Sequence, residues 1–303
     1  MIASTFPIIP CSIEETIAKE TGLNEIIDKH GVKKLAEELY PSFFDIEAGD
    51  WLFLLHTLNF SLWIPNSTKQ WTDNKLIWDP NYYMTIAPTE MKYIFRGDDE
   101  IILPYLEERR IILHRVGKTL KKKYGGLFIN CIRKSEYDAD KLMKILFKFE
   151  SYQDEIMFHG KPIRLYTKAK LLISDLQAYF PISSKSSIKT STLLKDYRAV
   201  QVLLHFGTIR YTENLQLLLR NRILCHGDIE ELQIRCCLIY IVQMVCDQVR
   251  KMCAEYKGCM TVQNTWMSHI STIVDNFIFD YQMKNSDYLM ETVPFHYIRT
   301  TMY

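Results

Sequence analysis

Helical periodicity constrains the fold of this chain more than any other feature. The stretch LPYLEERRIILHRVGKTLKKKYGG, which starts with Leu103 and Pro104, repeats apolar residues every three or four positions. That spacing places them on one face of a helix. Lysines in the last turn suit the negative end of the helix dipole, and Gly125 and Gly126 then end the helix. Similar patterns predict further helices over 12–22, 24–40, 135–149, 167–180, 192–206, 228–256 and 266–284. Two of these have capping residues, with Ser12 and Glu15 forming a capping box for the first and Ser135 capping the third.

Strand signals are limited to one short segment. Residues 155–166 alternate between apolar and polar types and break at Gly160, which is typical of a small β-hairpin. Internal repeats, low-complexity tracts and Pro/Gly-rich linkers are missing from the sequence. We therefore expect a mainly α protein with at most a small hairpin, folded as a single domain over residues 1–303.

Composition excludes several functional classes. The 37 basic and 36 acidic residues give a net charge of +1, so no field of the whole molecule attracts nucleic acid or an anionic membrane. The first residues do not resemble a signal peptide, and the longest apolar run, over 236–246, is too short to span a bilayer, so we expect a cytoplasmic protein. The eight cysteines form no Cys-x-x-Cys pair, and Gly-rich phosphate loops and dinucleotide fingerprints are missing. We therefore expect no metal and no cofactor.

Three carboxylates stand next to apolar or aromatic residues. Asp196 lies close to the predicted start of a helix, where the helix dipole keeps a carboxylate ionised. Asp275 and Asp280 lie within IVDNFIFDY. Residues five apart are separated by about 140° around a helix, so either both acids face one cleft near a helix end or one of them serves elsewhere. Helix caps and solvated faces are commoner than active sites, so each acid alone is better explained that way. The periodicity by itself predicts no more than a helical protein with an acidic pocket.

Six blocks of the sequence, in order, resemble the queuosine salvage protein family of queuosine 5'-phosphate N-glycosylase/hydrolases. They are HTLNFSLW (56–63), LPYLEERRIILHRVGKTLKKKYGGLFINC (103–131), DYRAVQVLLHFGTIRY (196–211), GDIEELQIR (227–235), DNFIFDY (275–281) and PFHYIRTTMY (294–303). The resemblance implies hydrolysis of the N-glycosidic bond of queuosine 5'-phosphate, which releases queuine for return to tRNA. It also implies a helical fold similar to that of helix-hairpin-helix DNA glycosylases. The helix, Gly turn and helix expected over 203–221 are compatible with that element.

The resemblance also implies roles for individual residues. Asp196 matches the family's catalytic Asp, whose ionised carboxylate either attacks the anomeric carbon or stabilises the positive charge that develops on the ribose. Asp275 and Asp280 match the acids that recognise the base, since carboxylates accept hydrogen bonds from its N–H groups. Phe279 is either a packing surface for the base or a plain core residue. Leu194 stands where the family usually has a Phe that stacks on the base, and a lost stack costs about 1–3 kcal/mol by analogy with nucleic-acid binders.

Other positions depart from the family pattern. His56 replaces an Asp, Tyr297 replaces an Arg, and the stretch 64–83 is shorter than usual. Two alternatives therefore stand beside the hydrolase that acts on a small-molecule nucleotide. One is a catalytically impaired paralogue that binds queuine or its nucleotide without turnover. The other is a DNA or RNA base glycosylase, which the neutral charge disfavours. Candidates for a phosphate contact, by charge alone, are Lys168, Lys170, Arg198 and Arg299.

Overall fold

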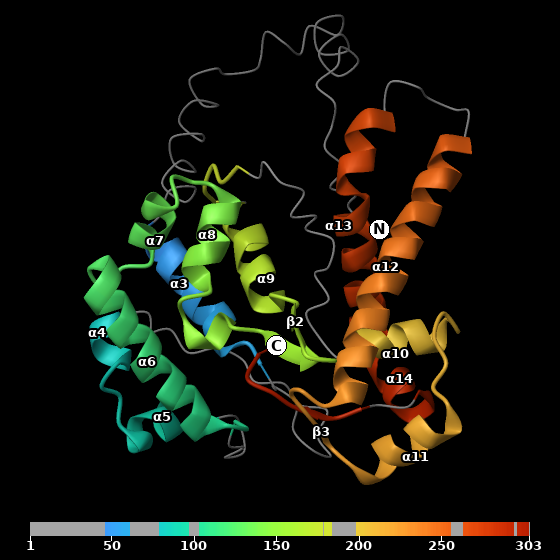
Figure 1. Cartoon of the computed structure of the whole chain (residues 1–303), viewed down its shortest axis with the longest axis horizontal. Helices are drawn as coiled ribbons and strands as arrows, with labels where there is room; N and C mark the ends of the chain where they lie inside the picture. Colours follow the sequence, from blue (N-terminus) through green and yellow to red (C-terminus); the bar gives the residue numbers. More distant parts are fainter. Residues whose placement is uncertain are drawn as a thin grey trace, which may run out of the picture. The chain divides into compact units, whose positions relative to one another are not determined.

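A computed structural model of the chain gives its fold (Figure 1). The structure describes residues 46–60, 79–96, 103–177, 179–183, 198–255, 263–293 and 296–302. All of them belong to the compact unit Ile46–Tyr303. The other unit, Met1–Asp45, lies outside the described residues, and so do the helices predicted over 12–22 and 24–40. A single domain over 1–303 therefore stays a prediction.

The described residues are mainly helical, as predicted. Their helices are α3 (Ile46–Leu58), α4 (Pro80–Tyr83), α5 (Pro88–Ile94), α6 (Leu106–Tyr124), α7 (Ile129–Lys134), α8 (Ala139–Leu146), a 3-10 turn η3 (Glu150–Tyr152), α9 (Thr167–Leu176), α10 (Arg198–His205), α11 (Glu213–Asn221), α12 (Ile229–Glu255), α13 (Gln263–Lys284) and α14 (Ser286–Thr292). The strands β1 (Glu155–Phe158) and β2 (Lys161–Arg164) form one sheet, and β3 (Leu224–Cys225) and β4 (Ile298–Arg299) form another. None of these helices is long and apolar enough to cross a membrane.

The first hydrophobic core lies among α3 to α9. Phe53 of α3 is buried at its centre, with its ring stacked 4.2 Å from that of Phe128 and 5.6 Å from that of Tyr152. Helix α6 ends as the sequence predicts, because Gly125 adopts a left-handed conformation with φ of 64° directly after it. Gly117 of α6 lets α4 approach closely, since a Cβ atom added there would lie 2.6 Å from Cβ of Met84.

The predicted hairpin is confirmed, and one predicted helix cap is wrong. Strands β1 and β2 pair antiparallel on either side of a turn at Gly160, whose φ is +75°. Helix α8 begins at Ala139, and Asp138 caps it by accepting a hydrogen bond from the backbone N–H of Lys141 at 2.9 Å. Ser135 instead follows α7 and donates to the carbonyl of Ile132 at 2.6 Å. The six-residue α7 ends directly before Ser135 and is too short to give a clear periodic pattern.

The second hydrophobic core lies among α10 to α14. The long helices α12 and α13 pack side by side, as Figure 1 shows, and α10 packs against α13. Helices α10 and α11 are joined by a loop in which Gly207 has φ of 66°, so the predicted helix, turn and helix are present. Similarity to helix-hairpin-helix DNA glycosylases stays a prediction. The parallel β3–β4 pair, which ties Leu224 to Ile298, was not predicted.

Candidate active site

Helices α10 and α13 bring together the two blocks that contain the predicted site residues. Helix α10 buries residues 199–203, and the apolar ones among them belong to the same hydrophobic cluster as Val274 and Ile278 of α13. Asp196 precedes the first residue of α10, Arg198, by two positions in the sequence. Asp196 and Leu194 lie in the segment 184–197, outside the described residues, so their roles stay predictions.

Asp275 lies on the buried face of α13. It is 5% exposed, and its neighbours Val274 and Ile278 are also buried. Burial raises the pKa of the Cys246 thiol on α12, and the charge of the Asp275 carboxylate raises it further. Removing an ionised carboxylate from water costs free energy, so burial sets Asp275 apart from the acids of solvated helix faces.

Phe279 and Asp280 are exposed on α13, although Phe279 lies only about one turn after Asp275. Phe279 is 53% exposed and Asp280 is also exposed, so neither belongs to the core. The structure therefore contradicts the core role of Phe279 that the sequence left open. It also separates Asp280 from Asp275, as the spacing of five residues in mid-helix requires. Asp280 thus lies on the solvated face of an amphipathic helix, whereas Asp275 does not.

A side-chain hydrogen bond connects α10 to α13 near their last turns. The hydroxyl oxygen of Tyr281 lies 2.8 Å from Nε2 of His205, and both residues are half-buried. The imidazole of His205 also meets the rings of Phe206 and Tyr288 edge-on, at centroid distances of 5.1 and 5.7 Å. Sequence reasoning missed this pair, although Tyr281 closes the DNFIFDY block and His205 lies within DYRAVQVLLHFGTIRY.

Two buried cations flank the ring of Phe60, which follows α3. The guanidinium of Arg109 lies 4.0 Å from the ring centroid, and the ammonium of Lys168 lies 4.8 Å from it. Arg109 donates to the carbonyls of Leu58 and Phe60, and Lys168 donates to the carbonyl of Thr57 at 3.1 Å. The last carbonyls of α3 are thus satisfied by positive groups, which also suits the helix dipole.

Burial dominates the electrostatics of Lys168. The side chain is fully enclosed, and desolvation together with the charge of Arg109 lowers the pKa of Lys168 to about 7, although Asp154 opposes the shift. Because Lys168 is enclosed and bonded to Thr57, it is poorly placed to contact a phosphate. Among the four cations selected by charge, Lys170 is half-buried and Arg299 is exposed.

The GDIEELQIR block contains an arginine, Arg235, that forms a buried ion pair. Arg235 of α12 donates to both carboxylate oxygens of Asp154, at 3.0 and 2.6 Å, and also bonds Glu231 at 3.2 Å. Burial alone would raise the pKa of Asp154, but the hydrogen bonds and charge of Arg235 hold it below its ordinary value. Since Asp154 precedes β1, this pair fastens the hairpin segment to α12.

Two of the departures from the family pattern, His56 and Tyr297, fall on described residues. His56 is buried, and its Nε2 lies 2.8 Å from a carboxylate oxygen of Asp175 on α9. The carbonyl of Tyr297 accepts a hydrogen bond from the backbone N–H of Leu224 at 3.0 Å, and the residue is half-buried. The third departure, the shorter 64–83 stretch, lies mostly outside the described residues.

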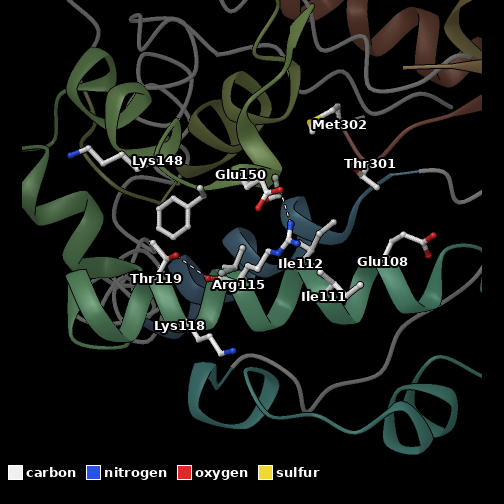
Figure 2. A pocket seen from close by; sticks show the side chains of 13 residues that line it. Glu108, Ile111, Ile112, Arg115, Lys118, Thr119, Lys148, Glu150, Thr301 and Met302 are labelled. Carbon is white, nitrogen blue, oxygen red and sulfur yellow. Dashed lines mark hydrogen bonds and ion pairs between the residues drawn. The ribbon is translucent and has the colours of Figure 1, made fainter. Parts of the chain in front are cut away.

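A groove of about 610 Å³ runs along α6 and contains none of the predicted site residues. Its walls come from α6, from residues 148–151 and from Thr301 and Met302 of the C-terminal segment. Figure 2 shows Arg115 reaching from α6 to Glu150, with which it forms an exposed ion pair of 2.6 Å. Across the described residues, no group of three His, Cys, Asp or Glu side chains is arranged to hold a metal ion.

Comparisons with known proteins identify the family. A family model described as queuosine salvage protein matches residues 68–303. Proteins named queuosine 5'-phosphate N-glycosylase/hydrolase from Mus musculus and Bos taurus are each 30% identical to this chain, over 98% and 96% of its length and 99% and 91% of theirs. A protein of the same name from Nematostella vectensis is 27% identical over 88% of this chain and 85% of its own. The chain therefore belongs to the queuosine salvage protein family.

Proposed function

We propose that this protein hydrolyses the N-glycosidic bond of queuosine 5'-phosphate and releases queuine for salvage into tRNA. The observation that carries the proposal is the similarity to proteins of that activity, which covers 98% of this chain and 99% of the Mus musculus protein. The substrate is a small-molecule nucleotide. In the reaction the bond between the anomeric carbon and the base nitrogen breaks, the base leaves with the electron pair and gains a proton, and water supplies the hydroxyl of ribose 5-phosphate.

Asp196 is the residue we propose at the centre of the chemistry. Departure of the base leaves positive charge on the ribose ring, and an ionised carboxylate next to the anomeric carbon stabilises that charge or bonds to the carbon directly. The sequence places Asp196 near the predicted start of a helix, and this supports the role because the amide dipoles at a helix start favour the ionised form. Leu194, two residues earlier, offers the base an apolar contact in place of the usual aromatic stack.

We propose that residues of α13 recognise the base. The N–H groups of a deazaguanine ring and the protonated amine of the queuine side chain both suit carboxylates, which only accept hydrogen bonds. Exposure leaves Phe279 and Asp280 available to a ligand. Burial of Asp275 supports a different role for that acid, in which it meets the deeper edge of the base. Direct binding of nucleic acid is not part of the proposal, because the net charge is only +1.

Release of queuine from queuosine 5'-phosphate by the purified protein tests the proposal. We expect turnover by the unmodified protein and a loss of about a thousandfold or more in Asp196→Asn, on the order of 4 kcal/mol of barrier. Asp247→Asn is a matched control, because Asp247 is an exposed acid on α12 that bonds Gln243 and Arg250 of the same helix. It should retain full activity, and guanosine 5'-phosphate should not be cleaved.

Two outcomes would contradict this function. If the unmodified protein binds queuine but releases none from queuosine 5'-phosphate, it is a binding protein that has lost turnover. Base release from an oligonucleotide, with none from the free nucleotide, would show a nucleic-acid glycosylase instead.

A further inference from the structure

We propose that His205 and Tyr281 are positioning residues for the reaction, and this inference rests on the proposed function. Their hydrogen bond of 2.8 Å joins α10 to α13. Each lies in the same block as a residue proposed for the site, because His205 follows Asp196 in DYRAVQVLLHFGTIRY and Tyr281 follows Asp275 in DNFIFDY. The bond therefore links the helix that follows the proposed catalytic Asp to the helix that carries the base-recognising acids.

Helix α10 depends on such contacts for its position. Its eight described residues form a short helix, and short helices are marginal in water unless neighbouring elements hold them. Its buried residues pack against α13, but apolar contact is non-directional and resists a small rotation of the helix only weakly. Directional bonds fix the rotation, and the described residues supply one from His205 to α13 and a longer one, 3.3 Å, from Gln201 to the carbonyl of Leu289.

The position of α10 matters because of what precedes it. Asp196 is two residues before Arg198, so a rotation or shift of α10 moves the backbone from which the proposed catalytic carboxylate extends. A misplacement of about 1 Å can cost on the order of a hundredfold in rate. Removing one of the contacts that hold α10 should therefore lower kcat about tenfold. KM should change less than twofold, because the base still meets the same side chains of α13.

Tyr281→Phe, compared with Tyr288→Phe, tests the inference. Both variants remove one hydroxyl from a tyrosine whose ring contacts the imidazole of His205. Within the described residues, only the hydroxyl of Tyr281 makes a hydrogen bond to that imidazole. We expect kcat for queuine release to fall about tenfold in Tyr281→Phe at nearly unchanged KM, and to stay within twofold of the unmodified protein in Tyr288→Phe. Equal kcat in the two variants would overturn the inference.

A second pair of variants keeps the test decisive if Tyr281→Phe folds poorly. His205→Gln places an amide near the position of Nε2 and can still bond Tyr281, whereas His205→Leu has similar bulk and cannot. We expect the Gln variant to retain at least half of kcat and the Leu variant to lose about tenfold. Similar kcat for both would refute the positioning role. An inactive unmodified protein would refute the proposed function itself, and the positioning role with it, so the two failures are distinguishable.

Discussion

Replacing Lys168 by Met should stabilise the protein, and by an amount that depends on pH. Desolvation and the charge of Arg109 lower the pKa of Lys168 from 10.5 to about 7. At about 1.4 kcal/mol for each tenfold change in the proton equilibrium, charged Lys168 costs the folded state about 5 kcal/mol. Methionine is apolar and flexible, and it fits such an enclosure without a charge. The gain is offset by loss of the bond to the carbonyl of Thr57, worth about 1–3 kcal/mol.

The sign of the pH dependence follows from proton binding. Below pH 7 Lys168 is protonated in both the folded and the unfolded state, so its full cost applies. Between pH 7 and 10.5 the unfolded state binds more protons than the folded state, and the unfolding free energy of the unmodified protein rises with pH. The Met variant lacks this rise. Its advantage should therefore be largest at pH 6 and smaller by about 3 kcal/mol at pH 9.

Urea unfolding at pH 6, 7.5 and 9 measures this difference. Loss of the Thr57 bond and changes in packing affect the variant equally at every pH. Titrating groups that do not interact with Lys168 are present in both proteins and cancel in the difference. Lys144→Met is the control, because Lys144 is exposed on α8, and it should change stability by the same small amount at each pH. A constant free-energy difference between Lys168→Met and the unmodified protein from pH 6 to 9 would refute the reasoning.

Two further changes test contacts within and between the hydrophobic cores. Asp154→Ala leaves the guanidinium of Arg235 buried without its bidentate partner, so we expect a loss of about 3–5 kcal/mol in urea unfolding. The loss should be smaller when Arg235→Met and Glu231→Gln are added, because Glu231 is the other buried acid that pairs with Arg235. If the triple variant is no more stable than Asp154→Ala, the ion pair does not act as described. Gly117→Ala should cost about 1–3 kcal/mol, because the new methyl group would meet Met84 at 2.6 Å. A neutral effect on the melting temperature would show that α4 can move away from α6.

Local signals in the sequence predicted the long helices well. The pattern over 228–256 matches α12 at Ile229–Glu255 within one residue at each end, and Gly125 marks the end of α6. The same periodicity describes part of α13. Ile270, Val274 and Ile278 repeat at intervals of four and define its buried face. Asp275 and Phe279 lie about 100° and 140° from Val274 on the same flank, so the sequence pattern alone does not separate the buried acid from the exposed ring.

Contacts between distant segments could not be predicted in this way. The parallel strands pair Leu224 with Ile298, and each has only two residues, too few to show a strand pattern. Burial of Lys168 depends on the segment around Phe60, more than a hundred residues earlier in the chain. A lysine in the first turn of a predicted helix is normally exposed, so only the tertiary structure shows that this one is enclosed.

The structure separates what the resembling blocks contribute to the fold from what they contribute to the chemistry. The block GDIEELQIR contains Arg235, which binds Asp154 and so has a structural role. The block HTLNFSLW contains Phe60, whose ring contacts the two buried cations Arg109 and Lys168. A chain that keeps these blocks keeps the scaffold whether or not it turns over a substrate. The expected activity rests instead on the two blocks that α10 and α13 join, and on Asp196 above all. Similarity over the whole length therefore establishes the family, whereas the catalytic role of Asp196 is tested by comparing queuine release by Asp196→Asn and Asp247→Asn.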